Sequence, residues 1–169
     1  EELISAGADI LDVGGESTRP FAEPISTEEE LRRVIPVIKG VRKKHTIPIS
    51  IDTTKATVAR EALQAGADII NDVSALNKDP EMITVVQQTS VPVIIMHMQG
   101  TPNDMQVKPV YSDVVTEIIN FFTERIDWLT SKGIDRNRLF IDPGIGFGKT
   151  LQHNLSILKH LDKFSSLNL

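Results

Sequence analysis

Short apolar runs that each stop at a polar residue recur along this chain. They lie at residues 9–13, 47–52, 68–73, 92–97 and 138–142, and segments with helical patterns separate them. Such alternation of buried-type strands with helices predicts a parallel α/β sheet. The carboxyl ends of parallel strands open on one face, so the polar residues that end the runs are expected to converge there and form a site.

Five strands are compatible with two architectures, an open doubly wound sheet and an arc of a (β/α)8 barrel. The pentapeptide Ala-Gly-Ala-Asp-Ile occurs at residues 6–10 and again at 65–69, which indicates a repeated strand-helix unit. A polar residue at the end of every strand, rather than at one crevice, favours the barrel. Since five strands cannot close one, we expect a partial (β/α)8 TIM barrel of α/β class.

Helical patterns follow each predicted strand. Ser26 and Glu29 form a possible capping box, and Trp128 is expected to be a core residue of the longest helix. The helices are predicted at residues 31–44, 56–65, 81–88, 112–131 and 151–164. Residues 1–8 resemble the end of a helix, and the chain stops where another strand would follow. We therefore expect residues 1–169 to be part of one longer domain.

Composition narrows the classes of partner. The net charge is −5, and the chain contains no cysteine. An acidic chain is a poor ligand for nucleic acid, and the lack of cysteine excludes disulfides and thiolate metal sites. No segment of about 20 apolar residues and no signal-peptide pattern occurs. We therefore expect no nucleic-acid partner, no membrane partner and a cytoplasmic location.

The segment Gly14-Gly15-Glu16-Ser17-Thr18-Arg19-Pro20 is a candidate binding loop for an anion. Glycines allow backbone amides to approach a ligand, hydroxyls add neutral donors, and Arg19 offers two parallel donors to a phosphate or carboxylate. An ordinary turn with a surface ion pair is the alternative. The concentration of functional residue types in one loop favours binding.

Asp52, Asn71 and Asp142 end three of the apolar runs. Taken singly, an Asp at this position more often caps the following helix, and this alternative applies to Asp52 and Asp72. Taken together, three acceptor-rich groups on one face would be poorly satisfied without a ligand. The set therefore indicates a binding site.

The glycine-rich segment at residues 142–150 fits neither nucleotide motif. Pro143 occupies the first glycine position of a P-loop, and Lys149 occupies the third glycine position of the dinucleotide pattern. What remains is a carboxylate at a strand end and a loop that carries Phe147. His97 is either a catalytic base or a packed, hydrogen-bonded histidine, and packing is the favoured interpretation.

Four segments in order resemble the dihydropteroate synthase family of folate biosynthesis. They lie at residues 9–20, 48–76, 92–106 and 139–158. The resemblance implies a (β/α)8 barrel, a transferase and a sulfonamide target. Such enzymes join 6-hydroxymethyl-7,8-dihydropterin pyrophosphate to p-aminobenzoate and release pyrophosphate, with Mg²⁺ as cofactor. The chain is similar to the second to sixth βα units of that barrel.

Carried over by motif, the resemblance implies roles for individual residues. The predicted pterin-binding residues are Thr18, Asp52, Asn71 and Asp142. Arg19, Pro20 and Phe147 would frame the p-aminobenzoate or sulfonamide position, and Asp52 and Arg19 are the predicted catalytic residues. A carboxylate accepts paired bonds from the adjacent N–H groups of a pterin edge, and an amide can both donate and accept there.

The first and the last two βα units of the family have no counterpart in these residues. The family's Mg²⁺ ligand belongs to the first unit, so the chain is expected to contain no metal ligand. We expect the isolated chain to be inactive and poorly soluble or molten, because sheet edges and apolar faces would be exposed. The longer enzyme is expected to be a homodimer. The alternatives are a pterin-binding methyltransferase domain of the methyltetrahydrofolate/corrinoid type, and a non-catalytic pterin-binding fragment.

Overall fold

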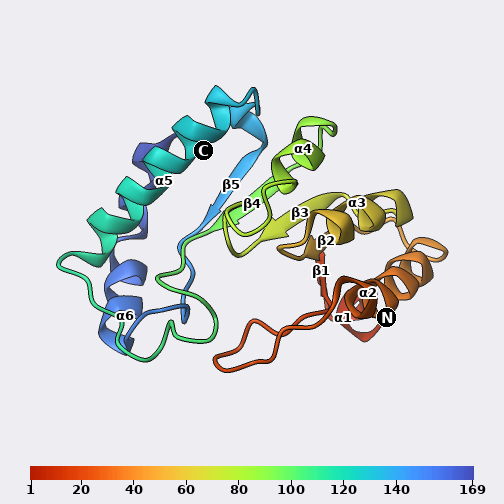
Figure 1. Ribbon diagram of the computed structural model, residues 1–169, viewed down its shortest axis with the longest axis horizontal. Coiled ribbons are helices and arrows are strands. Elements are labelled where there is room, and N and C mark those ends of the chain that lie inside the picture. Colours follow the sequence, from red (N-terminus) through yellow and green to blue (C-terminus); the bar gives the residue numbers. More distant parts are fainter.

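The computed structural model describes all 169 residues and contains one five-stranded parallel sheet (Figure 1). The strands are β1 Leu11–Gly14, β2 Ile49–Asp52, β3 Ile69–Asp72, β4 Val93–Met96 and β5 Leu139–Asp142. Their spatial order is β1-β2-β3-β4-β5. A doubly wound sheet reverses its strand order at one point, and this sheet does not. The predicted parallel sheet is confirmed, and the order is that of a barrel arc.

Side chains alternate between two faces of the sheet, as the pleat requires. On β2, Ile49 and Ile51 are fully buried against the helices, so Ser50 and Asp52 point to the opposite, concave face. The register pairs Gly14 with Asp52, Asp52 with Asn71, and Met96 with Asp142. Polar side chains of neighbouring strands therefore lie side by side on the concave face.

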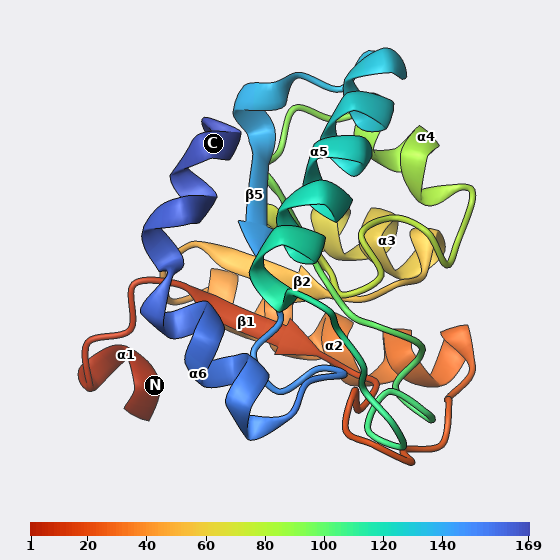
Figure 2. The same cartoon turned by 90° about the vertical axis from the view of Figure 1, so that its left-hand side faces the viewer.

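Helices cover the convex face of the sheet, except α1, none of whose residues is buried. The helices are α1 Glu2–Ser5, α2 Thr27–Arg42, α3 Ala56–Ala65, α4 Met82–Gln87, α5 Val114–Ser131 and α6 Leu151–Lys159, with 3-10 turns at Arg136–Arg138 and Leu161–Leu167. In Figure 1, α2 and α3 flank one end of the sheet, and α5 and α6 flank the other. Figure 2 shows that β5 runs at a steep angle to β1, which reflects the twist accumulated across the sheet.

The helices begin at capping residues that the sequence provides. Ser26 Oγ accepts a hydrogen bond from the Glu29 amide, but Glu29 does not complete the predicted capping box, because its carboxylate binds Arg32 and Arg33. Asp113 caps α5 by accepting from two backbone amides. A capping box does occur at Thr150, at the start of α6.

A cluster of 28 buried residues fills the space between the convex face of the sheet and the helices. On α5 its members recur at helical spacing, as Ile118, Phe122, Ile126 and Leu129. The prediction that Trp128 lies in this core is wrong, because its side chain is 40% exposed. Trp128 lies on the polar side of α5 and stacks with the Arg125 guanidinium, whose Cζ is 4.2 Å from the centroid of the Trp128 ring.

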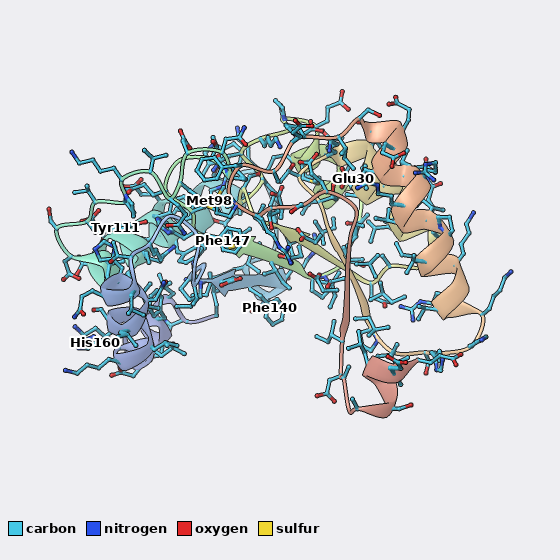
Figure 3. The ribbon with its side chains drawn as sticks, turned by 90° about the horizontal axis from the view of Figure 1, so that it is seen from below. Glu30, Met98, Tyr111, Phe140, Phe147 and His160 are labelled. Carbon is cyan, nitrogen blue, oxygen red and sulfur yellow. The ribbon has the colours of Figure 1, made fainter.

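The sheet and helices form an open arch (Figure 3), and several of its large apolar side chains are exposed. Phe140 projects from the concave face of β5 and is 54% exposed. Helix α6 exposes Leu151, Leu155 and Leu158. The helix predicted at residues 151–164 ends earlier, at Lys159, and continues as the 3-10 turn.

Candidate active site

Four polar side chains, those of Asp12, Ser50, Asp52 and Asn71, lie together on the concave face of β1, β2 and β3. The Asp12 carboxylate accepts hydrogen bonds from the Ser50 hydroxyl and from the Asn71 amide, the latter at 3.4 Å. Asp52 lies beside Asn71 in the strand register. The predicted convergence of Asp52 and Asn71 is therefore observed, and Asp12 joins them.

Asp12 was not predicted as a site residue. It lies in the middle of an apolar run, whereas the predicted site residues end such runs. The alternation of the half-buried Leu11 and Val13 with a charged residue was the available signal, because it is the pattern of a strand whose second face is polar.

Asp52 carries the most altered acidity of this cluster. Burial, followed by the charges of Asp12, Asp72, Glu30 and Glu16, raises the pKa of Asp52 to about 7. No side chain or backbone amide of the chain donates a hydrogen bond to its carboxylate. A half-buried carboxylate with unsatisfied acceptors is a characteristic feature of ligand sites.

Neither Asp72 nor Asp52 caps a helix, because the Asp72 carboxylate binds within a turn and α4 begins only after Glu81. Asp72 is fully buried on the convex side, and its Oδ1 accepts from the Ser74 amide at 2.7 Å and from the Ser74 hydroxyl at 2.6 Å. The first amide of α3, that of Ala56, binds the Asp79 carboxylate instead of Asp52. Asp52 is therefore left available to a ligand.

Asp142 lies at the end of β5 on the same concave face. It pairs with Met96 in the register, and its Oδ1 accepts from the Gly144 amide at 2.8 Å. One carboxylate oxygen thus shapes the following loop, while the other has no partner within the chain. Asp142 combines a structural role with a free acceptor.

The loop between β1 and α2 places Thr18 against a cavity whose volume is about 480 Å³. The walls come from the loops after β1, β2, β3 and β4 and from α5, and include Met96 and Phe121. Asp52, Asn71 and Asp142 are outside this lining. The cavity borders the concave cluster through Met96, which lines the cavity and pairs with Asp142 in the register.

Arg19 and Pro20 are exposed on the same loop. No acidic side chain pairs with the Arg19 guanidinium, so the surface ion pair of the alternative interpretation is not formed. A free guanidinium on an exposed loop is available to an anionic ligand.

The glycine-rich loop after β5 passes very close to the loop after β4. A Cβ atom on Gly144, whose φ is +70°, would lie 2.1 Å from the His97 carbonyl oxygen. The Lys149 ammonium is buried at this crossing, where it contacts His97 Nδ1 at 3.1 Å, the His97 carbonyl at 3.1 Å and the Phe147 carbonyl at 2.9 Å. Lys149 thus holds the backbone beside Phe147, which Figure 3 shows near Met98.

His97 is a packed residue and not a base. Burial, followed by the Lys149 charge, lowers the pKa of His97 to about 4, so its ring is neutral and accepts the Lys149 hydrogen bond. Burial also lowers the pKa of Lys149 to about 8. The ring of Phe121 packs edge-on against His97, with centroids 4.9 Å apart. The favoured interpretation of His97 is confirmed.

Two general features of the chain concern metals and membranes. No group of three or more His, Asp or Glu side chains is placed to hold a metal ion. None of the helices is both long enough and apolar enough to cross a bilayer.

Comparisons with known proteins agree with this geometry. The family model described as "Pterin binding enzyme" matches residues 1–169. The dihydropteroate synthase of Escherichia coli strain K12 is 47% identical over 167 residues, which is 99% of this chain and 59% of that protein.

Solved structures show the same arrangement of elements. The dihydropteroate synthase of Yersinia pestis, solved as a sulfonamide drug complex, gives a TM-score of 0.96 at 43% identity, covering 99% of this chain and 61% of that one. The enzyme of Xanthomonas albilineans with 4-aminobenzoic acid gives 0.92 at 48% identity, over 99% and 59%. The same enzyme in complex with 7,8-dihydropteroate gives 0.87 at 43% identity, over 99% and 60%. The chain thus spans about 60% of the length of the relatives it matches.

Proposed function

Because the chain belongs to the pterin-binding enzymes, the family matched over all 169 residues, we propose that it is part of an enzyme that performs the dihydropteroate synthase reaction. In that reaction, the amine of p-aminobenzoate attacks the methylene of 6-hydroxymethyl-7,8-dihydropterin pyrophosphate. A C–N bond forms, the C–O bond to pyrophosphate breaks, and the amine loses a proton. The products are 7,8-dihydropteroate and pyrophosphate.

We assign pterin recognition to Asp52, Asn71, Asp142 and Thr18. The aminopyrimidinone edge of a pterin presents adjacent N–H donors, which match the unsatisfied oxygens of Asp52 and Asp142. The Asn71 amide can donate and accept at the mixed edge. Thr18 lies at the cavity wall, and we assign it to the pyrophosphate side of the substrate. Asp12 would act by holding the Asn71 amide in place.

Asp52 is proposed to act in the transition state as well as in binding. Departure of pyrophosphate leaves positive charge on the pterin ring system. An ionised carboxylate fixed beside that charge stabilises the transition state more than the ground state. Asp52 carries a pKa of about 7 without ligand, and the donors and positive charge of a bound pterin favour its ionised form. No nucleophilic side chain is required.

Arg19, Pro20 and Phe147 are proposed to form the p-aminobenzoate position. Arg19 is exposed and carries no ion-pair partner, so its guanidinium can bind the carboxylate of p-aminobenzoate or the leaving pyrophosphate. Phe147 offers a ring to the aromatic substrate, and its backbone is fixed by Lys149. A sulfonamide with the same outline would occupy the same position.

The remaining assignments rest on the family resemblance. We expect Mg²⁺ to accompany the pyrophosphate, but no residue of this chain is assigned to the ion, because the resemblance places the family's ligand in the first βα unit. A homodimeric enzyme and a cytoplasmic location are also proposed on the basis of the resemblance.

The observation that carries the proposal is the concave cluster of Asp52 and Asn71, whose acceptors are left free by the fold. The test uses a chimera in which the 169 residues of this chain replace the matching 167-residue segment of the Escherichia coli relative. We expect the chimera to restore growth of a folate-requiring strain that lacks dihydropteroate synthase. An Asp52→Asn chimera should fail to do so. Growth supported equally by both would contradict the site assignment.

Calorimetry on the 169-residue chain itself tests the expected inactivity of the isolated chain. We expect weak binding of a pterin ligand and no turnover. Tight, Mg²⁺-dependent binding of the pterin pyrophosphate would contradict the view that further residues are needed. Product formation that does not depend on p-aminobenzoate would contradict the proposed reaction.

A further inference from the structure

The loop that carries Thr18, Arg19 and Pro20 has few contacts of its own. Within it, the Arg19 amide contacts Ser17 Oγ at 3.4 Å, and the Ala22 amide donates to the Arg19 carbonyl at 3.1 Å. Phe21 at the tip is 71% exposed. These local bonds do not fix the loop relative to the sheet, so its position must be set at its base.

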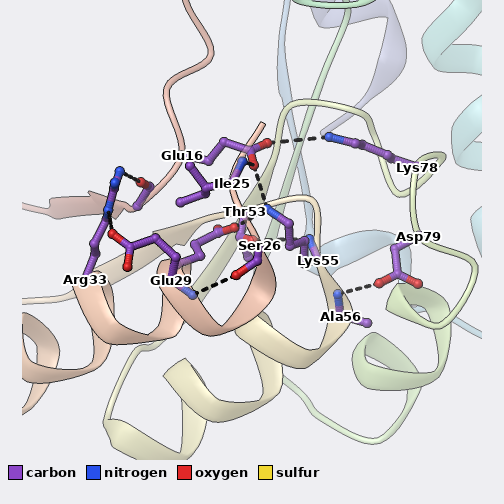
Figure 4. A network of polar contacts seen from close by, with 12 residues as sticks. Glu16, Ile25, Ser26, Glu29, Arg33, Thr53, Lys55, Ala56, Lys78 and Asp79 are labelled. Atoms are coloured by element: carbon purple, nitrogen blue, oxygen red, sulfur yellow. Dashed lines mark hydrogen bonds and ion pairs between the residues drawn. The ribbon is translucent and has the colours of Figure 1, made fainter. Parts of the chain in front are cut away.

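The Glu16 carboxylate joins the two ends of this loop (Figure 4). Its Oε2 accepts a hydrogen bond from the Ile25 amide at 3.0 Å and from the Lys55 ammonium at 2.6 Å. Glu16 follows the end of β1 and Ile25 precedes α2, so one carboxylate closes the loop. The tip is thereby confined to residues 17–24.

Lys55 connects this closed loop to the strand that carries Asp52. It lies three residues after Asp52, at the start of α3, and its ammonium also binds the carboxylate of Glu30 on α2. Glu30 is 1% exposed. One cation thus holds two carboxylates from two other elements, in the interior of the arch.

A partly buried ion cluster of this kind does little for net stability. Removing charges from water costs nearly as much as their attraction returns, and such clusters are best explained by the geometry that they specify. Here the geometry is the position of the loop relative to the end of β2. Loss of Lys55 would leave the Glu30 carboxylate without its cation. Glu16 would keep only the Ile25 amide and the more exposed Lys78, 3.6 Å away, so the loop would no longer be tied to α3.

We propose that Lys55 and Glu16 are positioning residues that hold the Thr18–Arg19 loop at a fixed place relative to Asp52. They touch neither substrate and act through the loop. The proposal rests on the proposed function, because it assigns the loop to p-aminobenzoate and pyrophosphate. It adds that the affinity for the second substrate is set by an ion cluster behind the site.

Kinetics of the chimera give the first test. Lys55→Met should raise the KM for p-aminobenzoate about tenfold. The Kd of a pterin that lacks the pyrophosphate should change less than about threefold, since Asp52 and Asn71 lie on strands and the loop does not contact that ligand. Lys55→Arg keeps the cation and should recover most of the loss. Lys44→Met removes the same charge from an exposed ion pair and should change neither constant. Equal changes in the KM for p-aminobenzoate and in the Kd of the pterin would overturn the proposal.

A ligand-free measurement separates this proposal from the proposed function. Chymotrypsin cleavage of the substrate-free chimera after Phe21, followed by mass spectrometry, reports the freedom of the loop. Lys55→Met should accelerate this cut about tenfold while leaving cuts elsewhere unchanged. If Lys55→Met does not fold, Glu16→Gln serves instead, because it keeps an acceptor for the Ile25 amide but loses the charge that binds Lys55. An unchanged cleavage rate at Phe21 would overturn the proposal. Faster cleavage in a protein that binds no substrate would support the role of Lys55 in holding the loop, and would refute only the proposed function.

Discussion

The acidity of Asp52 predicts a pH dependence of catalysis that can be calculated from the structure. Burial and four neighbouring carboxylates raise its pKa to about 7, so below that pH the unliganded site holds a neutral acid. A neutral acid has one acceptor oxygen fewer and cannot stabilise positive charge. Since kcat/KM reports the free enzyme, its value should fall about tenfold for each pH unit below 7.

The size of the effect follows from the fraction of Asp52 that is ionised. With a pKa of 7, about 1% is ionised at pH 5, so kcat/KM should be about a hundredfold below its value on the alkaline plateau. Asp52→Asn removes the charge at every pH. The loss of charge-assisted hydrogen bonds should cost about 3 kcal/mol, or about a hundredfold, at pH 8. The two proteins should therefore converge near pH 5.

The assay measures kcat/KM for the pterin pyrophosphate in the chimera from pH 5 to 8.5. Asp142→Asn serves as the matched control, because it also replaces a concave-face carboxylate. It should lower the plateau but leave the midpoint near 7. A flat profile in the unsubstituted chimera, or a midpoint that persists in Asp52→Asn, would refute the role of Asp52 as the titrating group.

Three further predictions concern stability, each measured by urea unfolding of the chimera. Asp52→Asn should raise the free energy of unfolding by up to about 4 kcal/mol at pH 8 and by almost nothing at pH 4. The reason is that the pKa of Asp52 is raised in the folded state, so the stability of the unsubstituted protein falls as pH rises from about 4 to 7. An equal gain at both pH values would contradict this. Gly144→Ala should cost about 3 kcal/mol or more, since its Cβ would meet the His97 carbonyl, whereas Gly133→Ala, with open space around it, should cost only about 1 kcal/mol. Asp113→Ala should cost about 1 kcal/mol through loss of the α5 cap, and no change would show that the cap is replaced by water.

Much of the fold was predictable because the hydrophobic periodicity and the positions of the turn and capping residues agree along the chain. All five strands lie within the predicted runs, apart from the extension of β1 to Gly14, and α3 has the predicted bounds of Ala56–Ala65. Strand order could be inferred only from the polar strand ends. The error in the prediction for Trp128 has a clear cause. On α5, positions 122, 126 and 129 face the core, whereas position 128 lies on another face of the helix.

The site was predictable in its residue types but not in its supporting contacts. Asp52 and Asn71 end apolar runs, and this local signal was sufficient. Asp12 sits inside a run, and its contact with Asn71 spans 59 positions of sequence. The same holds for Lys55 and Glu16, which lie 39 positions apart. Such pairings depend on the register of the sheet, which no local pattern specifies.

The strand register determines where each concave-face side chain lies along the axis of the barrel. Asn71 pairs with Ile94, and Ile94 pairs with Phe140, so Asp142 stands two residues further along its strand than Asn71. In a (β/α)8 barrel with a shear of 8, neighbouring strands slip by about one residue, and layers are built from alternate strands. From β3 to β5 the register therefore slips by about two residues, which equals the offset of Asp142 relative to Asn71. Strand tilt therefore brings Asn71 and Asp142 to one level along the barrel axis, where a flat molecule can touch both.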